Sequence, residues 1–84
     1  MNIHSAIIEG EKILRKKFIQ TSYLDSEILM AKVLNKDKKY IFLNLKKYLK
    51  KEQLNNFKRL IIERSFKKPV AHGVEIALIE VYPA

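Results

Sequence analysis

Asp25 and Glu27 are the close carboxylate pair of interest in this sequence, because carboxylate pairs can carry out general acid–base catalysis. Both lie near the start of an apolar helical segment, where acidic side chains cap amides and interact favourably with the helix dipole. A structural role accounts for both residues without any reaction. We therefore interpret them as cap or ion-pair residues, with Arg64 as the basic partner of one of them.

No other residues are spaced for catalysis or for metal binding. The histidines, His4 and His72, have no ligand partners at metal-binding spacing, and the chain has no cysteine. A reducing, cytoplasmic location is expected, because disulfides are excluded and the charged first 20 residues do not resemble a signal peptide. The tyrosines alternate with lysines, as in some single-strand binders. We place them at the edges of the core instead, at positions 23, 40, 48 and 82.

The net charge of +8 suggests a polyanion as partner. We discount nucleic acid, because only three of the seventeen basic residues are arginine and the lysines occur in every segment. A basic helical module that binds RNA or another polyanion remains the alternative function. No apolar run approaches the roughly 20 residues that cross a membrane.

The elements that hold these residues form one small domain, since the chain has 84 residues. Apolar periodicity predicts an all-α bundle of four to five helices, the main four near 3–18, 24–35, 38–45 and 51–66. The second is expected to be the most buried, with an inward stripe of Leu24, Ile28, Ala31 and Leu34.

Several details of these helices follow from the residue types at their ends and faces. Asn2, Ser22 and Asp37 are predicted N-caps, Asn35 is a predicted stop, and Gly10 is expected to let another helix approach closely. The first helix should turn Phe18 inward, and the last helix should extend its apolar face with Ile62 and Phe66. Pro69 should end that helix, and residues 70–84 form a β-prone tail.

Three segments resemble one protein family when they are taken in order. Leu24-Asp25-Ser26-Glu27-Ile28-Leu29-Met30-Ala31-Lys32-Val33-Leu34 is similar to a helix of the form Asp-Ala-Glu-Leu-Leu-Leu-Ala-His-Val-Leu. Residues 49–54 resemble a Leu-Ser-Pro-Glu-Gln-Leu helix start, and Arg64 with residues 69–72 resembles an Arg-x-x-x-x-Pro-x-x-Tyr/His exit. This order resembles the N-terminal domain of the HemK/PrmC family of peptide-chain release factor glutamine N5-methyltransferases.

The resemblance covers residues 1–72 and implies a domain that docks a release factor for an S-adenosylmethionine-dependent methyltransferase domain. It also implies that Pro69 and His72 form the hinge toward that domain. The lysines Lys46, Lys47, Lys50 and Lys51 on the basic faces of the helices could then steer an acidic partner; the alternative is that they form only a solvated surface. Lys50 stands where the family has a serine cap, so the start of that helix is expected to fray.

The family's catalytic parts are not found in this sequence. Its Gly-rich cofactor loop and its Asn-Pro-Pro-Tyr motif are missing, and residues 73–84 do not match the family. We expect no catalytic or cofactor-binding residue, and no methyl transfer by this chain alone. The tail reads as a frameshifted or truncated end, and a gene fragment without a function of its own is a further alternative.

Overall fold

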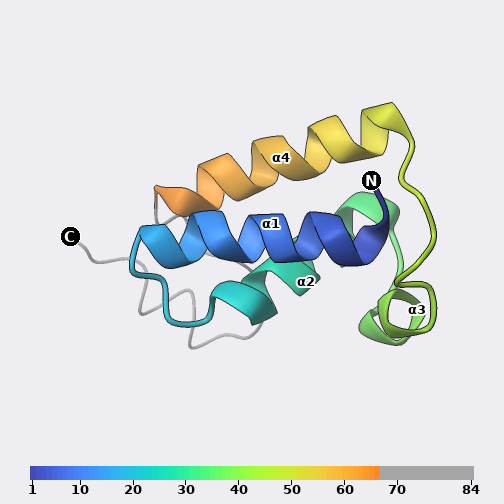
Figure 1. Ribbon diagram of the computed structural model, residues 1–84, viewed down its shortest axis with the longest axis horizontal. Helices are drawn as coiled ribbons and strands as arrows, with labels where there is room; N and C mark the ends of the chain where they lie inside the picture. Colours follow the sequence, from blue (N-terminus) through green and yellow to red (C-terminus); the bar gives the residue numbers. More distant parts are fainter. Residues whose placement is uncertain (67–84) are drawn as a thin grey trace.

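The computed structural model describes residues 1–66, which form four α-helices. They are α1 (Ile3–Lys16), α2 (Ser22–Leu34), α3 (Lys38–Leu43) and α4 (Lys51–Ser65). The chain folds back between α1 and α2, and α4 runs beside α1 in the same direction (Figure 1). The predicted all-α fold is confirmed, and the predicted β-prone tail lies outside the described residues.

The core lies between α1, α2 and α4, and α2 packs against all three other helices. This position agrees with the prediction of a central second helix. Burial is nevertheless shared, because α1 and α2 each contribute five buried residues. The buried apolar side chains are Ile3, Ala6, Ile7, Leu14, Ile19, Leu29, Met30, Ile41, Phe57 and Ile61.

The inward face of α2 is rotated from the predicted stripe and is partly polar. Asp25 and Ser26 are fully buried, together with Leu29 and Met30, whereas the predicted stripe is only half-buried. Two hydrogen-bonded polar side chains replace apolar ones on this face, which is why hydrophobicity alone misplaced it. Ser22 is also not the N-cap, because the helix already begins there and Thr21 precedes it.

Other helix ends follow the predictions. Asn2 Oδ1 accepts from the Ser5 amide at 2.8 Å, and Asp37 Oδ1 accepts from the Tyr40 amide at 2.9 Å. Asn35 ends α2 in the left-handed conformation, with a φ of 56°. The Lys50 side chain cannot accept a hydrogen bond, but Gln53 Oε1 accepts from the Lys50 amide at 2.8 Å. The first turn of α4 is therefore held where fraying was expected.

Phe18 does not continue the inward face of α1, contrary to the prediction. The helix ends at Lys16, and Phe18 adopts a left-handed conformation with a φ of 61° and 89% of its surface exposed. The Ile19 and Phe18 amides donate to Leu14 and Arg15 carbonyls, which is the Schellman pattern. This turn places Ile19 in the core in place of Phe18.

Several more apolar side chains lie further out than their patterns indicate. Ile62 and Phe66 on the α4 side are 48% and 70% exposed, so they do not extend the inward face. On α3, which ends two residues earlier than predicted, only Ile41 is buried. Tyr48, expected at a core edge, is 75% exposed because it lies on the connection after α3.

Gly10 allows the close approach of helices that was predicted for it. A Cβ at this position would lie 2.6 Å from Ser26 Oγ and 2.8 Å from Ile61 Cδ1. Ser26 is fixed there because its hydroxyl donates to the Ile7 carbonyl at 2.8 Å. Gly10 therefore packs α1 against both α2 and α4.

The connection between α3 and α4 is fastened to the start of the chain. The Ile3 amide donates to the Lys47 carbonyl and the His4 amide to the Leu45 carbonyl, both at 2.9 Å. The Leu49 amide donates back to the Met1 carbonyl at 3.0 Å. These hydrogen bonds satisfy otherwise open amides at the start of α1 and fix the backbone of the lysine-rich connection.

Candidate partner-binding surface

The carboxylate pair singled out in the sequence is divided between two structural roles. Asp25 is fully buried, and its Oδ2 accepts from Arg64 Nε at 2.9 Å and from Thr21 Oγ1 at 3.0 Å. Glu27 faces Lys38 instead, with 3.8 Å between Oε1 and Nζ. Asp25 thus joins α2 to α4, and Glu27 joins α2 to α3.

Tyr23 lies beside these carboxylates near the start of α2, with 38% of its surface exposed. Partial burial raises the pKa of its phenol above the ordinary value, and the charges of Glu27 and Glu11 raise it further. Tyr23 is therefore harder to ionise than an ordinary tyrosine, and it lines a shallow hollow with Glu11, Arg15 and Glu27.

Residues 36–51 concentrate positive charge, although lysines also occur in the other segments. This segment contains seven of the fourteen lysines and one acidic residue, Asp37. The predicted steering residues Lys46, Lys47, Lys50 and Lys51 are all exposed. Among residues 1–66, the single ion pair recorded for a lysine is that of Lys38 with Glu27.

Two of these lysines gather around Tyr40. The ammonium groups of Lys36 and Lys47 lie 5.2 and 5.7 Å from the centre of its ring, and Lys47 Nζ donates to its hydroxyl at 3.0 Å. Together with Lys50, they line a hollow of about 210 Å³. We call this the Tyr40 hollow.

A second hollow adjoins the first, since Lys47 lines both. Phe42, Leu43 and Lys46 also line it, and its volume is about 440 Å³. Phe42 and Leu43 are 73% and 66% exposed. We call this the Phe42 hollow; it places apolar side chains next to ammonium groups at the end of α3.

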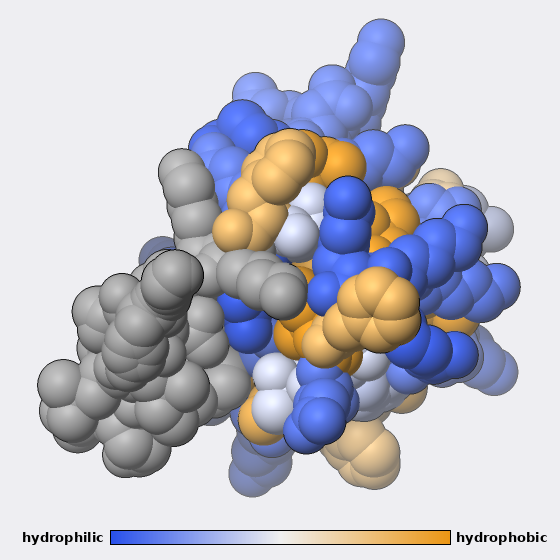
Figure 2. Space-filling model, turned by 90° about the vertical axis from the view of Figure 1, so that its left-hand side faces the viewer, coloured by the Kyte–Doolittle hydropathy of each residue, from blue (hydrophilic) through white to orange (hydrophobic). Residues whose placement is uncertain are grey.

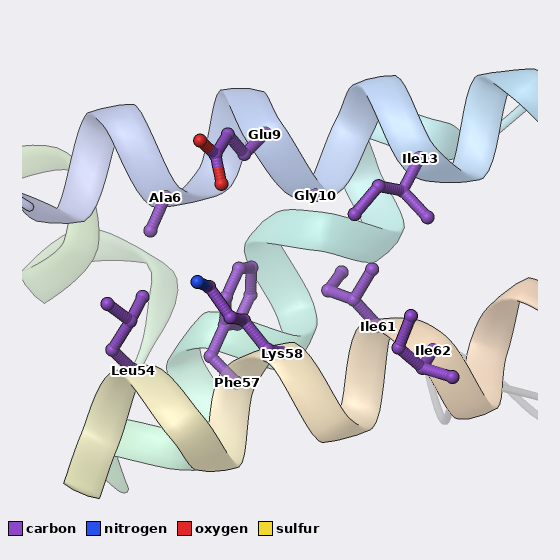
Figure 3. Close-up of a pocket in the computed structure, with 9 residues that line it drawn as sticks. All are labelled: Ala6, Glu9, Gly10, Ile13, Leu54, Phe57, Lys58, Ile61 and Ile62. Atoms are coloured by element: carbon purple, nitrogen blue, oxygen red, sulfur yellow. The ribbon is translucent and has the colours of Figure 1, made fainter. Parts of the chain in front are cut away.

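An apolar groove of about 320 Å³ lies along the contact between α1 and α4. Ala6, Gly10 and Ile13 line it from α1, and Leu54, Phe57, Ile61 and Ile62 line it from α4 (Figure 3). Among residues 1–66, its charged lining residues are Glu9 and Lys58. The other lining residues of this part of the chain supply no acid, base or nucleophile.

Apolar side chains are also exposed at the end of the bundle where α1 and α4 terminate (Figure 2). Phe18 and Phe66 follow those helices and are 89% and 70% exposed. The predicted hinge residues Pro69 and His72, like Tyr82, lie outside the described residues.

The part of the chain that the structure describes contains no group of three side chains that could hold a metal ion. Within residues 1–66, no helix is long and apolar enough to cross a membrane. The described surface combines clustered positive charge with exposed apolar side chains, and both are suited to contact with another molecule.

Comparison with known proteins identifies the family of the chain. The family model described as the PrmC N-terminal domain matches residues 5–72. The chain belongs to this family. Its sequence is 34% identical over 71 residues to the release factor glutamine methyltransferase of Leptospira interrogans, and 32% identical over 72 residues to that of Clostridium botulinum.

The matches cover most of this chain but little of each relative. They include 84% and 86% of the chain and 25% of each of the two methyltransferases. The chain therefore spans about a quarter of the length of the curated relatives that it matches. No solved structure is significantly similar to it.

Proposed function

We propose that residues 1–72 form a domain that docks a peptide-chain release factor for a glutamine methyltransferase. The family match over residues 5–72 is the observation that carries this proposal. The names of the two relatives supply the reaction and its substrate. Binding energy from a docking domain can position a substrate without contact with the reacting atoms.

Methyl transfer itself belongs, in this proposal, to a catalytic region that uses S-adenosylmethionine. The residues of this chain do not fit that cofactor, because its glycines are Gly10 and Gly73 and neither belongs to a Gly-rich loop. Gly10 is packed within α1 against Ser26 and Ile61. We expect calorimetry to detect no saturable S-adenosylmethionine binding by this chain, and micromolar binding would overturn that expectation.

Two sets of residues have roles in this proposal. Pro69 and His72 form the hinge toward the catalytic region, since Pro69 breaks the helical pattern that ends near residue 66. Lys46, Lys47, Lys50 and Lys51 attract an acidic partner over a distance, an effect that weakens as salt rises.

The experiment mixes this chain with its organism's release factor and with the remaining three quarters of a relative's methyltransferase. Binding of the release factor, and faster methylation when the chain is added, are the expected results. If the chain neither binds the release factor nor changes the rate, the docking role is wrong.

RNA or another polyanion is the second candidate ligand, and the seven lysines of residues 36–51 favour it. Such a ligand would lose affinity steeply as salt rises, because each lysine–phosphate contact releases counterions. Titration of the chain with a single-stranded RNA at several salt concentrations, beside the release factor, separates the two candidates.

A further inference from the structure

The positive charge around the Tyr40 hollow favours binding of an anionic ligand. Lys36 and Lys47 are held near one ring, and Lys50 lines the same hollow. Like charges brought together in this way repel one another. Among the described residues, none of these three lysines forms a recorded ion pair with a carboxylate. An acidic group bound here would relieve the repulsion.

The Phe42 hollow adds a requirement for an apolar group. Phe42 and Leu43 are neighbours in sequence, and each has about two thirds or more of its surface exposed. Adjacent large apolar side chains with this exposure are typical of contact surfaces, where burial removes them from water. Lys47 lines both hollows, so one short ligand segment could place a carboxylate in one and an apolar side chain in the other.

The composition of the surface favours a protein ligand over a nucleic acid. Residues 36–51 contain no arginine, the residue best suited to phosphate and base contacts. Leu43 offers no aromatic face on which a base could stack, although Phe42 and Tyr48 do. An aliphatic side chain beside ammonium groups matches a peptide segment in which acidic residues flank a large apolar one.

We propose that the Tyr40 and Phe42 hollows together bind an acidic protein segment that inserts one apolar side chain against Phe42 and Leu43. This inference rests on the proposed function, because it assigns the segment to the release factor. It goes beyond long-range attraction by lysines, since it requires direct contact with two apolar residues and with Lys36 and Lys47.

The test compares two double variants of this chain by calorimetric titration with the release factor. Phe42→Ala with Leu43→Ala should weaken binding at least tenfold and leave its salt dependence unchanged. Lys36→Glu with Lys47→Glu should weaken binding to a similar extent and also flatten the salt dependence.

Matched controls separate contact from general surface effects. Phe18→Ala removes a phenylalanine that is more exposed than Phe42 and follows the C-terminal end of α1. That end of α1 lies away from α3 (Figure 1). Lys12→Glu with Lys16→Glu reverses two exposed lysines on α1. Both controls should bind the release factor within about twofold of the unchanged chain, and circular dichroism should show that every variant is folded.

Several results would overturn the inference. If both double variants bind the release factor as tightly as the unchanged chain, the hollows are not the contact, although the docking role survives. If only the lysine variant weakens binding, the lysines act by attraction alone and the apolar contact is wrong.

A peptide probe keeps the inference testable if the release factor does not bind. The probe has twelve residues, in which glutamates flank a central Leu-Phe pair, and a twelve-nucleotide oligouridylate serves as the competitor. Peptide binding that both double variants abolish supports the chemistry of the surface while the docking role fails. Tighter binding of the oligouridylate at the same residues overturns the inference.

Discussion

At the scale of single residues, Asp25 shows how a carboxylate suited to catalysis can serve packing instead. It is fully buried, and its Oδ2 is held by Arg64 and Thr21. A buried charge is costly unless it is paired and hydrogen-bonded, so its charged partner on α4 makes its position possible. The sequence indicates that Arg64 pairs with one of the two carboxylates, and the fold shows that this carboxylate is Asp25 and not Glu27.

Replacement of Asp25 with asparagine should destabilise the domain far more than the equivalent change at Glu27. Asp25→Asn removes the negative charge that Arg64 faces in the interior, which costs about 3–5 kcal/mol. Glu27→Gln affects a pair with an exposed lysine and should cost less than about 1 kcal/mol. Urea unfolding followed by circular dichroism measures both, and equal costs would contradict the assigned burial of Asp25.

Tyr23 should make stability depend on pH in the alkaline range. Its pKa is raised in the folded chain, mainly by burial, so the unfolded chain loses this proton first as the pH rises. The contribution of Tyr23 to the free energy of unfolding is therefore fully present below about pH 10, the ordinary pKa of tyrosine, and decreases above it. Tyr23→Phe should remove part of this decrease in urea unfolding series, and an unchanged decrease would show that another group causes it.

At the scale of elements, the sequence predicts where helices form better than which face they bury. The capping residues Asn2 and Asp37 and the stop at Asn35 are confirmed, because short polar side chains act locally. The position of Phe18 is not confirmed, because a local turn after α1 replaces the helix that its apolar pattern predicts. The inward face of α2 is not confirmed either, because it depends on residues far away in sequence. Asp25 needs Arg64, and Ser26 needs the Ile7 carbonyl and the space beside Gly10.

The rotated face of α2 predicts an order of mutational effects. Leu29 is 5% exposed, so Leu29→Ala should cost about 2–5 kcal/mol. Ile28 belongs to the half-buried stripe, so Ile28→Ala should cost less than about 2 kcal/mol. Both variants can be measured by urea unfolding. A larger loss of unfolding free energy at Ile28 than at Leu29 would contradict the rotated face and support the inward face that the sequence predicts.

Gly10→Ala should destabilise the packing of α1 against α2 and α4. Alanine favours a helix by about 1 kcal/mol over glycine, but a Cβ here meets Ser26, Ile61 and Phe57 within 3.0 Å. Overpacking of this kind costs about 1–3 kcal/mol and should outweigh the helical gain. In a Ser26→Ala background the cost should fall, because the nearest atom is gone. A thermodynamic cycle of the four proteins tests this, and additive effects would contradict the contact.

At the scale of the whole molecule, the sequence indicated the family and the kind of surface but not how the surface is assembled. The lysines are visible in the sequence, whereas the exposure of Phe42 and Leu43 is not, since their pattern is that of a buried helix. Backbone hydrogen bonds between the first residues of the chain and the connection after α3 fix this region beside α1. The Ile3 and His4 amides donate to the connection, and the Met1 carbonyl accepts from it. Such pairing between distant segments leaves no periodic signal.

The net charge of +8 should make the domain more stable as salt rises at low ionic strength. Repulsion among the lysines of residues 36–51 opposes the folded state, and salt screens it over a Debye length of about 10 Å at 0.1 M. Between about 10 mM and 0.5 M sodium chloride, we expect the melting temperature to rise by a few degrees, since 1 kcal/mol corresponds to about 4–8 °C in a domain of this size.

Neutral variants locate the source of this repulsion. Lys46→Gln with Lys50→Gln should raise the melting temperature at low salt and reduce its salt dependence, because neither side chain forms an ion pair with a carboxylate of residues 1–66. Lys58→Gln is the control, since Lys58 shares the apolar groove with Glu9 and should gain nothing. Differential scanning calorimetry measures all three proteins. If the control gains as much as the double variant, the repulsion arises from the net charge as a whole and not from the segment between α2 and α4.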